Sequence, residues 1–293
     1  MASLRDVQNK INAVKKTKQI TKAMNMVASA KLRNAQSRIE RFRPYADKFY
    51  SMLSDLAGRA GEDVHPLLEK REEIKTTGIL LVTSDKGLCG SFNTNLINAA
   101  RKVAEEKQGK GRQVKLYCVG KKGRDSMRRR GFEIESAQVD VMNNFDFTLA
   151  NELGTGLIDD YLIGALDEVI LIYGEFVSVA KQVPVTLNLL PMSTDEVEEA
   201  EPSTSGNLEY IYEPSVEGLL AEILPRFIKV QVYRALLDTS ASEHAARMAA
   251  MENATSNCDE MISSLTLLYN KARQAAITTE LMDIVSGAEA LKG

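Results

Sequence analysis

The chain has 293 residues, 44% of them hydrophobic and 26% charged, which is enough for one or two domains with a sizeable core. It lacks an apolar run of the roughly 18 residues typical of a membrane span, and its first residues lack the apolar centre of a secretory signal, so we expect a soluble protein inside the cell. The net charge is only −3, but residues 1–50 carry twelve Lys or Arg against three acidic residues, a local charge of +9 that favours an acidic partner.

Residues 1–58 are predicted to form one long helix. Apolar side chains recur at heptad spacing for more than seven heptads, as in the seam of a coiled coil. Thirteen of the sixteen seam positions are apolar, and Pro44 is expected either to kink the helix or to remove one backbone hydrogen bond locally, without ending the helix. The seam consists of Leu4, Val7, Ile11, Val14, Lys18, Thr21, Asn25, Ala28, Leu32, Ala35, Ile39, Phe42, Ala46, Phe49, Leu53 and Leu56.

The same helix carries a second apolar stripe where its seam turns polar. Burial of Lys18 without a partner would be costly, so a dry seam is not expected at this level. The second stripe lies about 200° around the helix from Lys18 and should meet something other than the paired helix. It consists of Ile20, Met24 and Val27.

The middle of the chain alternates between strand-like and helix-like segments. Residues 59–77 are a connector, and residues 78–192 are predicted to form a central α/β, Rossmann-like domain with a mostly parallel sheet. Expected strands are 78–84, 113–120, 132–139, 167–176 and an irregular last strand around Pro184; expected helices are 93–107, 121–130 and 148–164.

Residues 193–213 are acidic and rich in turn formers, and they are expected to form a solvated loop and a return strand. Residues 214–293 are predicted to form a second long helix that pairs antiparallel with the first. It is roughly 20 residues longer, so its end would overhang by about 30 Å. Its expected seam is Met251, Ala254, Cys258, Met261, Leu265, Leu268, Ala272 and Ala275, with Ile262 and Tyr269 widening the stripe. Its apolar tip is Ile277, Leu281, Ile284, Ala288 and Leu291.

The stretch TSDKGLCGSFN, residues 83–93, lies between a strand and a helix, where an α/β protein often keeps its chemistry. A phosphate-binding P-loop requires the pattern G-x-x-x-x-G-K-[ST]. Here Lys86 precedes both Gly87 and Gly90, and no Ser or Thr follows a Gly-Lys pair. The stretch GTGLID, which begins at Gly154, lacks the third glycine of a dinucleotide fingerprint. Neither stretch predicts a nucleotide site.

Asp85, Lys86 and Cys89 could form a catalytic cluster, but no histidine lies near them in the sequence. His65 and His244 fall in different predicted elements, so catalysis based on histidine is not expected. The three cysteines form no C-x-x-C pair, which argues against a disulfide framework and a zinc site. A packed structural turn is therefore favoured over a catalytic site.

Three stretches of the chain carry recognisable motifs: TKQITKAMNMVASAKL, SDKGLCGSFN and YNKARQAAITTELMDIVSGAEA. They resemble the γ-subunit family of the rotary ATP synthase in its bacterial form. The last stretch carries the family signature at Ile277, Thr278, Glu280, Asp283, Gly287 and Ala288. The resemblance implies a non-catalytic central rotor shaft, which couples ion-driven ring rotation to conformational changes at the β-subunit sites for ATP synthesis or hydrolysis. It also implies that the chain itself has no catalytic residue, cofactor or metal.

The family's partners are the three α and three β subunits of the catalytic head, the ε subunit and the ring of c subunits. No nucleic acid is implied, and membrane association on the cytoplasmic side of the bacterial plasma membrane arises only through the complex. The resemblance places Met24, Arg247, Arg273 and Gln274 at the β subunit. It places Tyr210 and Glu213 at the foot near the c ring, and the apolar tip defined above in a hydrophobic collar.

Two other interpretations of the sequence remain open. One is a small nucleotide-dependent α/β enzyme with a coiled-coil dimerisation arm, which equilibrium dialysis with ATP and NAD would detect. The other is a nucleic-acid-binding coiled coil, because the basic first helix offers phosphate contacts whose affinity would fall steeply with salt. The unbroken apolar seam and the absence of interleaved aromatic residues argue against it.

Overall fold

The computed structural model describes residues 4–57, 65–69, 71, 73–192 and 216–290. The chain divides into two compact units. The helix-pair unit comprises Met1–Ala28 and Met248–Gly293, and the α/β unit comprises Ser29–Arg247.

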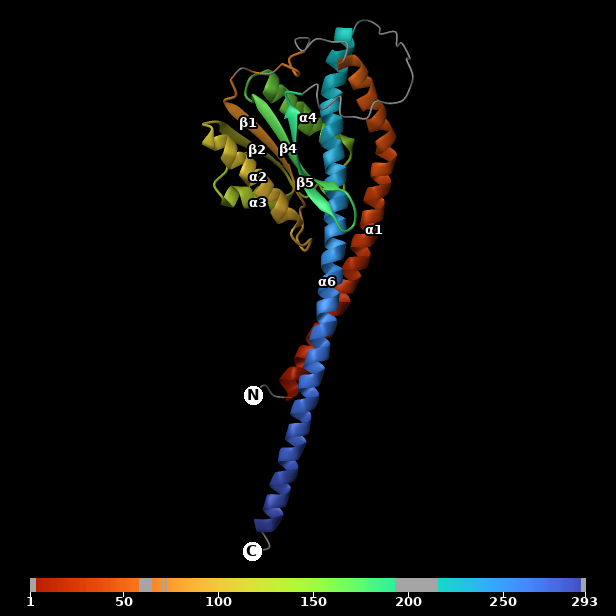
Figure 1. Cartoon of the computed structure of the whole chain (residues 1–293), viewed down its shortest axis with the longest axis vertical. Helices are drawn as coiled ribbons and strands as arrows, with labels where there is room; N and C mark the ends of the chain where they lie inside the picture. The colour runs from red at the N-terminus through yellow and green to blue at the C-terminus, as the bar shows by residue number, and fades with distance from the viewer. Residues whose placement is uncertain (1–3, 58–64, 70, 72, 193–215, 291–293) are drawn as a thin grey trace. The chain divides into compact units, whose positions relative to one another are not determined.

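Along the chain, a long helix comes first, alternating strands and helices follow, and a second long helix comes last (Figure 1). The predicted strands and helices of the α/β domain are all present among the described residues, and the first helix continues through Pro44 as expected. The helices are α1 (Leu4–Ala57), α2 (Phe92–Gly109), α3 (Lys121–Arg129), α4 (Phe147–Leu162) and α6 (Val216–Ala290). The strands are β1 (Thr76–Val82), β2 (Gln113–Val119), β3 (Ile134–Gln138), β4 (Glu168–Phe176) and β5 (Gln182–Leu190).

The sheet is mostly parallel, which confirms the prediction. Its strand order is β3-β2-β1-β4-β5, and only the pairing of β4 with β5 is antiparallel. The central strand β1 is a run of apolar residues because it is covered on both faces. Pro184 lies on the edge strand β5, where a missing N–H group is tolerated.

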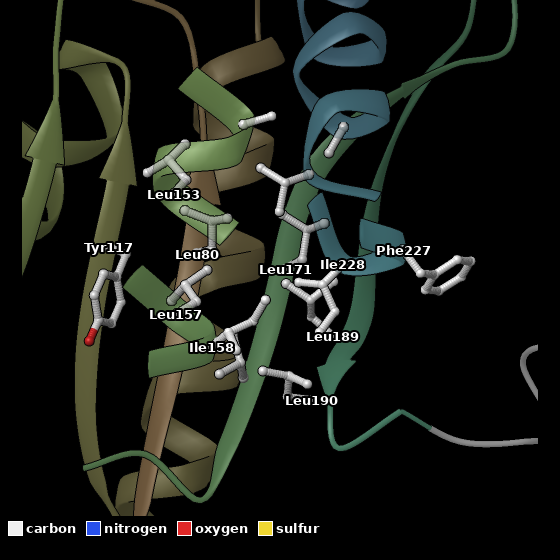
Figure 2. Packing of buried hydrophobic residues seen from close by; sticks show 14 of the residues in the cluster. Leu80, Tyr117, Leu153, Leu157, Ile158, Leu171, Leu189, Leu190, Phe227 and Ile228 are labelled. Atoms are coloured by element: carbon white, nitrogen blue, oxygen red, sulfur yellow. The ribbon is translucent and has the colours of Figure 1, made fainter. Parts of the chain in front are cut away.

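Alternate residues of β1 pack into two separate hydrophobic cores, one on each face of the sheet. Leu80 and Val82 of β1 belong to a core shared with α4 and α6, whereas Ile79 and Leu81 belong to one shared with α2 and α3. Figure 1 shows α2 and α3 together on one side of the sheet. In the other core, Figure 2 shows side chains of the strands, α4 and α6 gathered together, and its labelled residues include Leu80, Leu171, Leu157 and Ile228. The α/β unit therefore has three layers, with part of α6 in one of the outer layers.

In the helix-pair unit, α1 and α6 run antiparallel, as predicted. Side chains join them at a polar level: Thr21 Oγ1 lies 2.7 Å from Thr255 Oγ1, and Asn25 Nδ2 donates to the carbonyl of Met248 at 2.9 Å. Lys18 Nζ lies 2.5 Å from Asp259 Oδ1, and both side chains remain partly exposed. The expectation that Lys18 is not buried without a partner is thus confirmed.

The predicted seam of α6 is partly wrong. Met261 and Leu268 are 53% and 50% exposed, and Ala275 is also exposed. The half-buried positions include the predicted Ala254, Cys258, Leu265 and Ala272, together with Ile262 and Tyr269, which were expected to widen the stripe. Thr255 and Ala276 are half-buried as well and were not predicted. The predicted and the observed seam both start at Met251 and keep heptad spacing. The predicted seam moves first by three residues and then by four, whereas the observed seam moves first by four residues, to Thr255, and then by three. The contact of Thr255 with Thr21 selects this register, and side-chain polarity alone could not indicate it.

Candidate functional site

The loop after β1 is held from inside by the carboxylate of Asp85. This side chain is buried and accepts hydrogen bonds from the backbone N–H groups of Lys121 at 3.0 Å, Asp140 at 2.8 Å and Met142 at 3.0 Å. The carboxylate therefore satisfies three backbone donors, of which the N–H of Met142 belongs to a buried residue. Its two oxygens serve the fold rather than a substrate.

The side chain of Asn93, at the start of α2, closes the same loop. Its amide nitrogen donates to Ser84 Oγ at 2.7 Å and to Cys89 Sγ at 3.1 Å, and its oxygen accepts from the Ser84 N–H at 3.1 Å. Burial raises the pKa of the Cys89 thiol, which disfavours the reactive thiolate. The interpretation of residues 83–93 as a packed turn is supported over a catalytic cluster.

Arg247 on α6 anchors this loop from the other side. Its Nη2 donates to the carbonyl of Gly87 at 3.1 Å and to Glu243 Oε1 at 2.7 Å, and its Nη1 lies 3.3 Å from His244 Nδ1. The side chain is only 12% exposed. The guanidinium is therefore engaged inside the chain, a role that the sequence did not reveal.

The two titratable neighbours of Arg247 are shifted by their surroundings. Burial raises the pKa of Glu243, although the Arg247 charge and hydrogen bond act in the opposite direction. Burial, helped by the positive charges of Arg247 and Lys31, lowers the pKa of His244 to about 4. His244 is therefore neutral near pH 7, and its Nδ1 can accept a hydrogen bond from the Nη1 of Arg247.

The second apolar stripe of α1 lies largely at the surface of the helix-pair unit. Ile20 and Val27 are exposed, whereas Met24 between them is half-buried. Met26, which lies outside the predicted stripe, is 60% exposed. An apolar stripe on a basic helix suits a partner that presents both apolar and acidic groups.

The end of α6 is bare. Every side chain described from residue 277 to residue 288 is exposed, including the predicted Ile277, Leu281, Ile284 and Ala288. Met282 and Val285 are also exposed, and the prediction missed them because they lie beside the stripe rather than on it. Arg273 and Gln274, just before the bare segment, are exposed as well. This surface is wide enough to be surrounded by a partner.

Three residues assigned from the family resemblance lie outside the described residues. They are Tyr210 and Glu213, expected near the c ring, and Leu291 of the apolar tip. Their assignments stay predictions.

A cavity of about 180 Å³ in the α/β unit is lined by α1, the end of β4 and α6, with Arg43, Glu175, Arg234 and Asp238 among its charged residues. This is below the roughly 300 Å³ at which ligand pockets begin. Within the described ranges, no three His, Cys, Asp or Glu side chains are grouped to hold a metal ion. The helices searched there include none with the length and apolarity of a membrane span.

Comparison of this sequence with known proteins identifies a family and close relatives. A profile of the family described as ATP synthase matches residues 3–291. The ATP synthase gamma chain of Nitratidesulfovibrio vulgaris strain Hildenborough is 68% identical over 100% of both chains, and that of Lawsonia intracellularis is 53% identical over 100% of both.

Among solved structures, a chain from the central stalk and c-ring structure of Tetrahymena thermophila mitochondrial ATP synthase is similar. It is 30% identical with a TM-score of 0.61, and the match covers 80% of this chain and 99% of that one. A chain from the rotor of Euglena gracilis mitochondrial ATP synthase shares the fold at 20% identity and a TM-score of 0.63, over 94% and 98% of the two chains. The chain belongs to the family of ATP synthase gamma chains.

Proposed function

We propose that this chain is the non-catalytic central rotor shaft of a bacterial rotary ATP synthase. It couples ion-driven rotation of a c ring to conformational changes at the β-subunit sites, for ATP synthesis or hydrolysis. The observation that carries the proposal is the bare end of α6, which exposes an apolar surface beyond its pairing with α1 in a chain of this family. Exposure of such an apolar surface to water is unfavourable, so we expect a collar of partner subunits to cover it.

One asymmetric shaft inside a ring of three α and three β subunits would present a different face to each β site. That difference would force the three sites into different nucleotide states, and rotation would exchange those states in turn. The charge of +9 in residues 1–50 suits acidic levers on the β subunits, with an attraction that falls as salt rises.

Four residues are proposed to meet the β subunit: Met24, Arg247, Arg273 and Gln274. The exposure of Arg273 and Gln274 supports direct contact, and Met24 lies between the exposed Ile20 and Val27. For Arg247 the internal bonds favour an indirect part, in which it positions the loop at Gly87. Tyr210 and Glu213 are proposed to lie at the foot, near the c ring.

The proposed complex contains one copy of this chain per three α and three β subunits, together with ε and the c ring. It is peripheral on the cytoplasmic side of the plasma membrane and moves either protons or sodium ions. We divide the chain into a first shaft helix (1–58), a connector (59–77), an α/β domain (78–192), an acidic loop and return strand (193–213) and a second shaft helix (214–293). The packed state of Asp85 and Cys89 supports the absence of catalysis by the chain itself.

The test of the shaft function is reconstitution with the α and β subunits of the same organism. We expect the chain to join at one copy per three αβ pairs and to activate ATP hydrolysis by the mixture. A chain that stays free on gel filtration and leaves hydrolysis unchanged would sink the proposal.

The proposed β contact of Met24 has its own test in the full complex. Met24→Lys should lower the number of ions pumped per ATP more than it lowers assembly, because it adds positive charge beside an acidic lever. Met26→Lys is the matched control, since it adds the same charge about 200° away on the same helix. Normal pumping per ATP in Met24→Lys would show that the assignment is wrong.

A further inference from the structure

One stretch of α6 in the α/β unit is buried on every side. All twelve residues from Ala235 to Ala246 are buried, although half of them are polar or charged. Buried polar groups in proteins are usually hydrogen-bonded, and each one therefore points to a specific partner. The polar members are Asp238, Thr239, Ser240, Ser242, Glu243 and His244.

Two of these hydroxyl groups bond to one glycine of β4. The N–H of Gly174 donates to Thr239 Oγ1 at 3.2 Å, and the carbonyl of Gly174 accepts from Ser242 Oγ at 3.1 Å. Gly174 lies two residues beyond Ile172, the last residue of β4 that is paired with β1. Its backbone groups therefore extend past the end of β1, and the two hydroxyls of α6 supply partners where the neighbouring strand has stopped.

Gly174 is packed tightly against α2 on one side and lies at ordinary contact distance from α6 on the other. A Cβ atom there would lie 2.6 Å from Phe92 Cε2 and 3.6 Å from Ser242 Cβ. Beyond Ser242 on the same helix, Arg247 donates to the carbonyl of Gly87. Two separate backbone segments of the α/β domain are thus bonded to the same helix.

These bonds differ in kind from the rest of the contact between α6 and the domain. Elsewhere the helix packs through apolar side chains such as Leu224, Ile228 and Val232. Apolar packing has no direction, whereas a hydrogen bond weakens steeply when its angle changes. A twist of α6 against the sheet would therefore strain the bonds to Gly174 and Gly87 first.

We propose that Thr239 and Ser242, supported by Arg247, form a clasp that makes α6 and the α/β domain turn as one body. The clasp residues are positioning residues, and they would carry torque between the domain and the helix. This inference rests on the proposed rotor function, and it adds the residues through which the rotor resists internal twisting.

The test uses the complete complex, with its own α, β, ε and c subunits, in sealed vesicles. The double variant Thr239→Val with Ser242→Ala removes both hydroxyls and leaves α6 apolar at these positions. We measure ATP hydrolysis together with charge movement reported by a voltage-sensitive dye, which responds to protons and sodium ions alike. Hydrolysis should stay near the wild-type rate, whereas charge moved per ATP should fall, because both hydrogen bonds that hold α6 to Gly174 are lost.

The matched control is Ser263→Ala with Thr266→Val on the same helix. These hydroxyls donate only to carbonyls of α6 itself, those of Asp259 at 3.0 Å and Ile262 at 2.7 Å. The control should leave charge moved per ATP unchanged. Thr239→Ser keeps its hydroxyl and should restore coupling relative to Thr239→Val.

The outcomes separate the clasp from the rotor function. A wild-type complex that hydrolyses ATP without moving charge would contradict the rotor function itself. If the wild type pumps and the double variant matches the control, the clasp is wrong. A parallel fall in hydrolysis and charge movement would also overturn it, because this indicates a purely structural role. If the double variant does not assemble, the single variant Thr239→Val gives the same comparison.

Discussion

Two stretches of α6 reverse the usual relation between polarity and burial. Residues 235–246 are buried and contain Asp, Thr, Ser, Glu and His, whereas residues 277–288 are exposed and contain Ile, Leu, Met and Val. Both are regular α-helix in one continuous element. The difference therefore lies in what surrounds each stretch and not in its secondary structure.

The comparison teaches that each stretch is matched to a different kind of partner. The buried polar stretch finds its partners inside the chain, in backbone groups such as those of Gly174 and Gly87. The exposed apolar stretch has no such cover among the described residues, so its partner is expected in another subunit. Variants of the buried polar stretch should therefore lower the stability of the chain, whereas variants of the exposed apolar stretch should weaken its assembly with other subunits.

The largest effect is expected at the exposed stretch. Leu281→Asp with Ile284→Asp should weaken assembly with the α–β head by about 3 kcal/mol or more, because two apolar side chains would no longer be buried there. That corresponds to roughly a hundredfold more chain for the same activation of hydrolysis. Thr279→Asp is the control for added charge. Unchanged activation by the double variant, with a normal melting temperature, would mean that no collar surrounds this surface.

A pH dependence is expected at the buried stretch, through His244. Its pKa of about 4 in the folded chain lies below the ordinary 6.5, so the unfolded chain takes up the proton first. The stabilisation is complete above pH 6.5 and is lost as pH falls toward 4, by about 3 kcal/mol. His244→Gln should therefore lose less stability than the wild type on acidification.

Asp238 acts in the opposite direction over the same range, because burial raises its pKa to about 6. The measurement is therefore the difference in melting temperature between His244→Gln and the wild type, at pH 7 and pH 4.5. A difference that does not change with pH would contradict the neutral, buried state of His244.

A smaller loss is expected from Gly174→Ala. The new Cβ would clash with the ring of Phe92 and push this ring of α2 away from β4, which should cost about 2 kcal/mol of unfolding free energy, as overpacking commonly does. Thermal unfolding measures it. Gly156→Ala is the control, since a Cβ there meets no atom within 4 Å. Equal melting temperatures for the two variants would show that the close packing of Phe92 against Gly174 is unimportant.

The smallest effect is expected at the polar level of the helix pair. The ion pair of Lys18 with Asp259 is partly exposed, so a double-mutant cycle with Lys18→Met and Asp259→Asn should give a coupling energy of about 0.5 kcal/mol. A coupling energy above roughly 2 kcal/mol would instead indicate a dry seam at this level.

Most of the fold could be predicted from the periodicity of apolar residues. The terminal helices and the alternating strands of the α/β domain could be predicted because each repeats its apolar residues with its own period. The seam of α6 could not be fixed to the residue, because both series of steps that start from Met251 pass mainly through apolar residues. The contact that decides between them joins Thr21 to Thr255, which are far apart in the chain.

The sites divide in the same way. The apolar tip at Ile277, Leu281 and Ile284 followed from local spacing, and its exposure is confirmed. The internal bonds of Arg247 and Thr239 could not be predicted, because they depend on backbone groups at Gly87 and Gly174 that only the tertiary fold brings near. Hydroxyl groups on a helix often bond to a carbonyl of their own helix, as Ser263 does.

The central claim is that this chain rotates inside its head, and direct observation of rotation tests it. A bead would be attached at Lys102→Cys, an exposed position on α2, in a chain with Cys258→Ser; Cys89 and Cys118 are buried. With the α and β subunits fixed to a surface, ATP should drive the bead in one direction with three stops per turn. A bead that only fluctuates while ATP is hydrolysed would contradict the account.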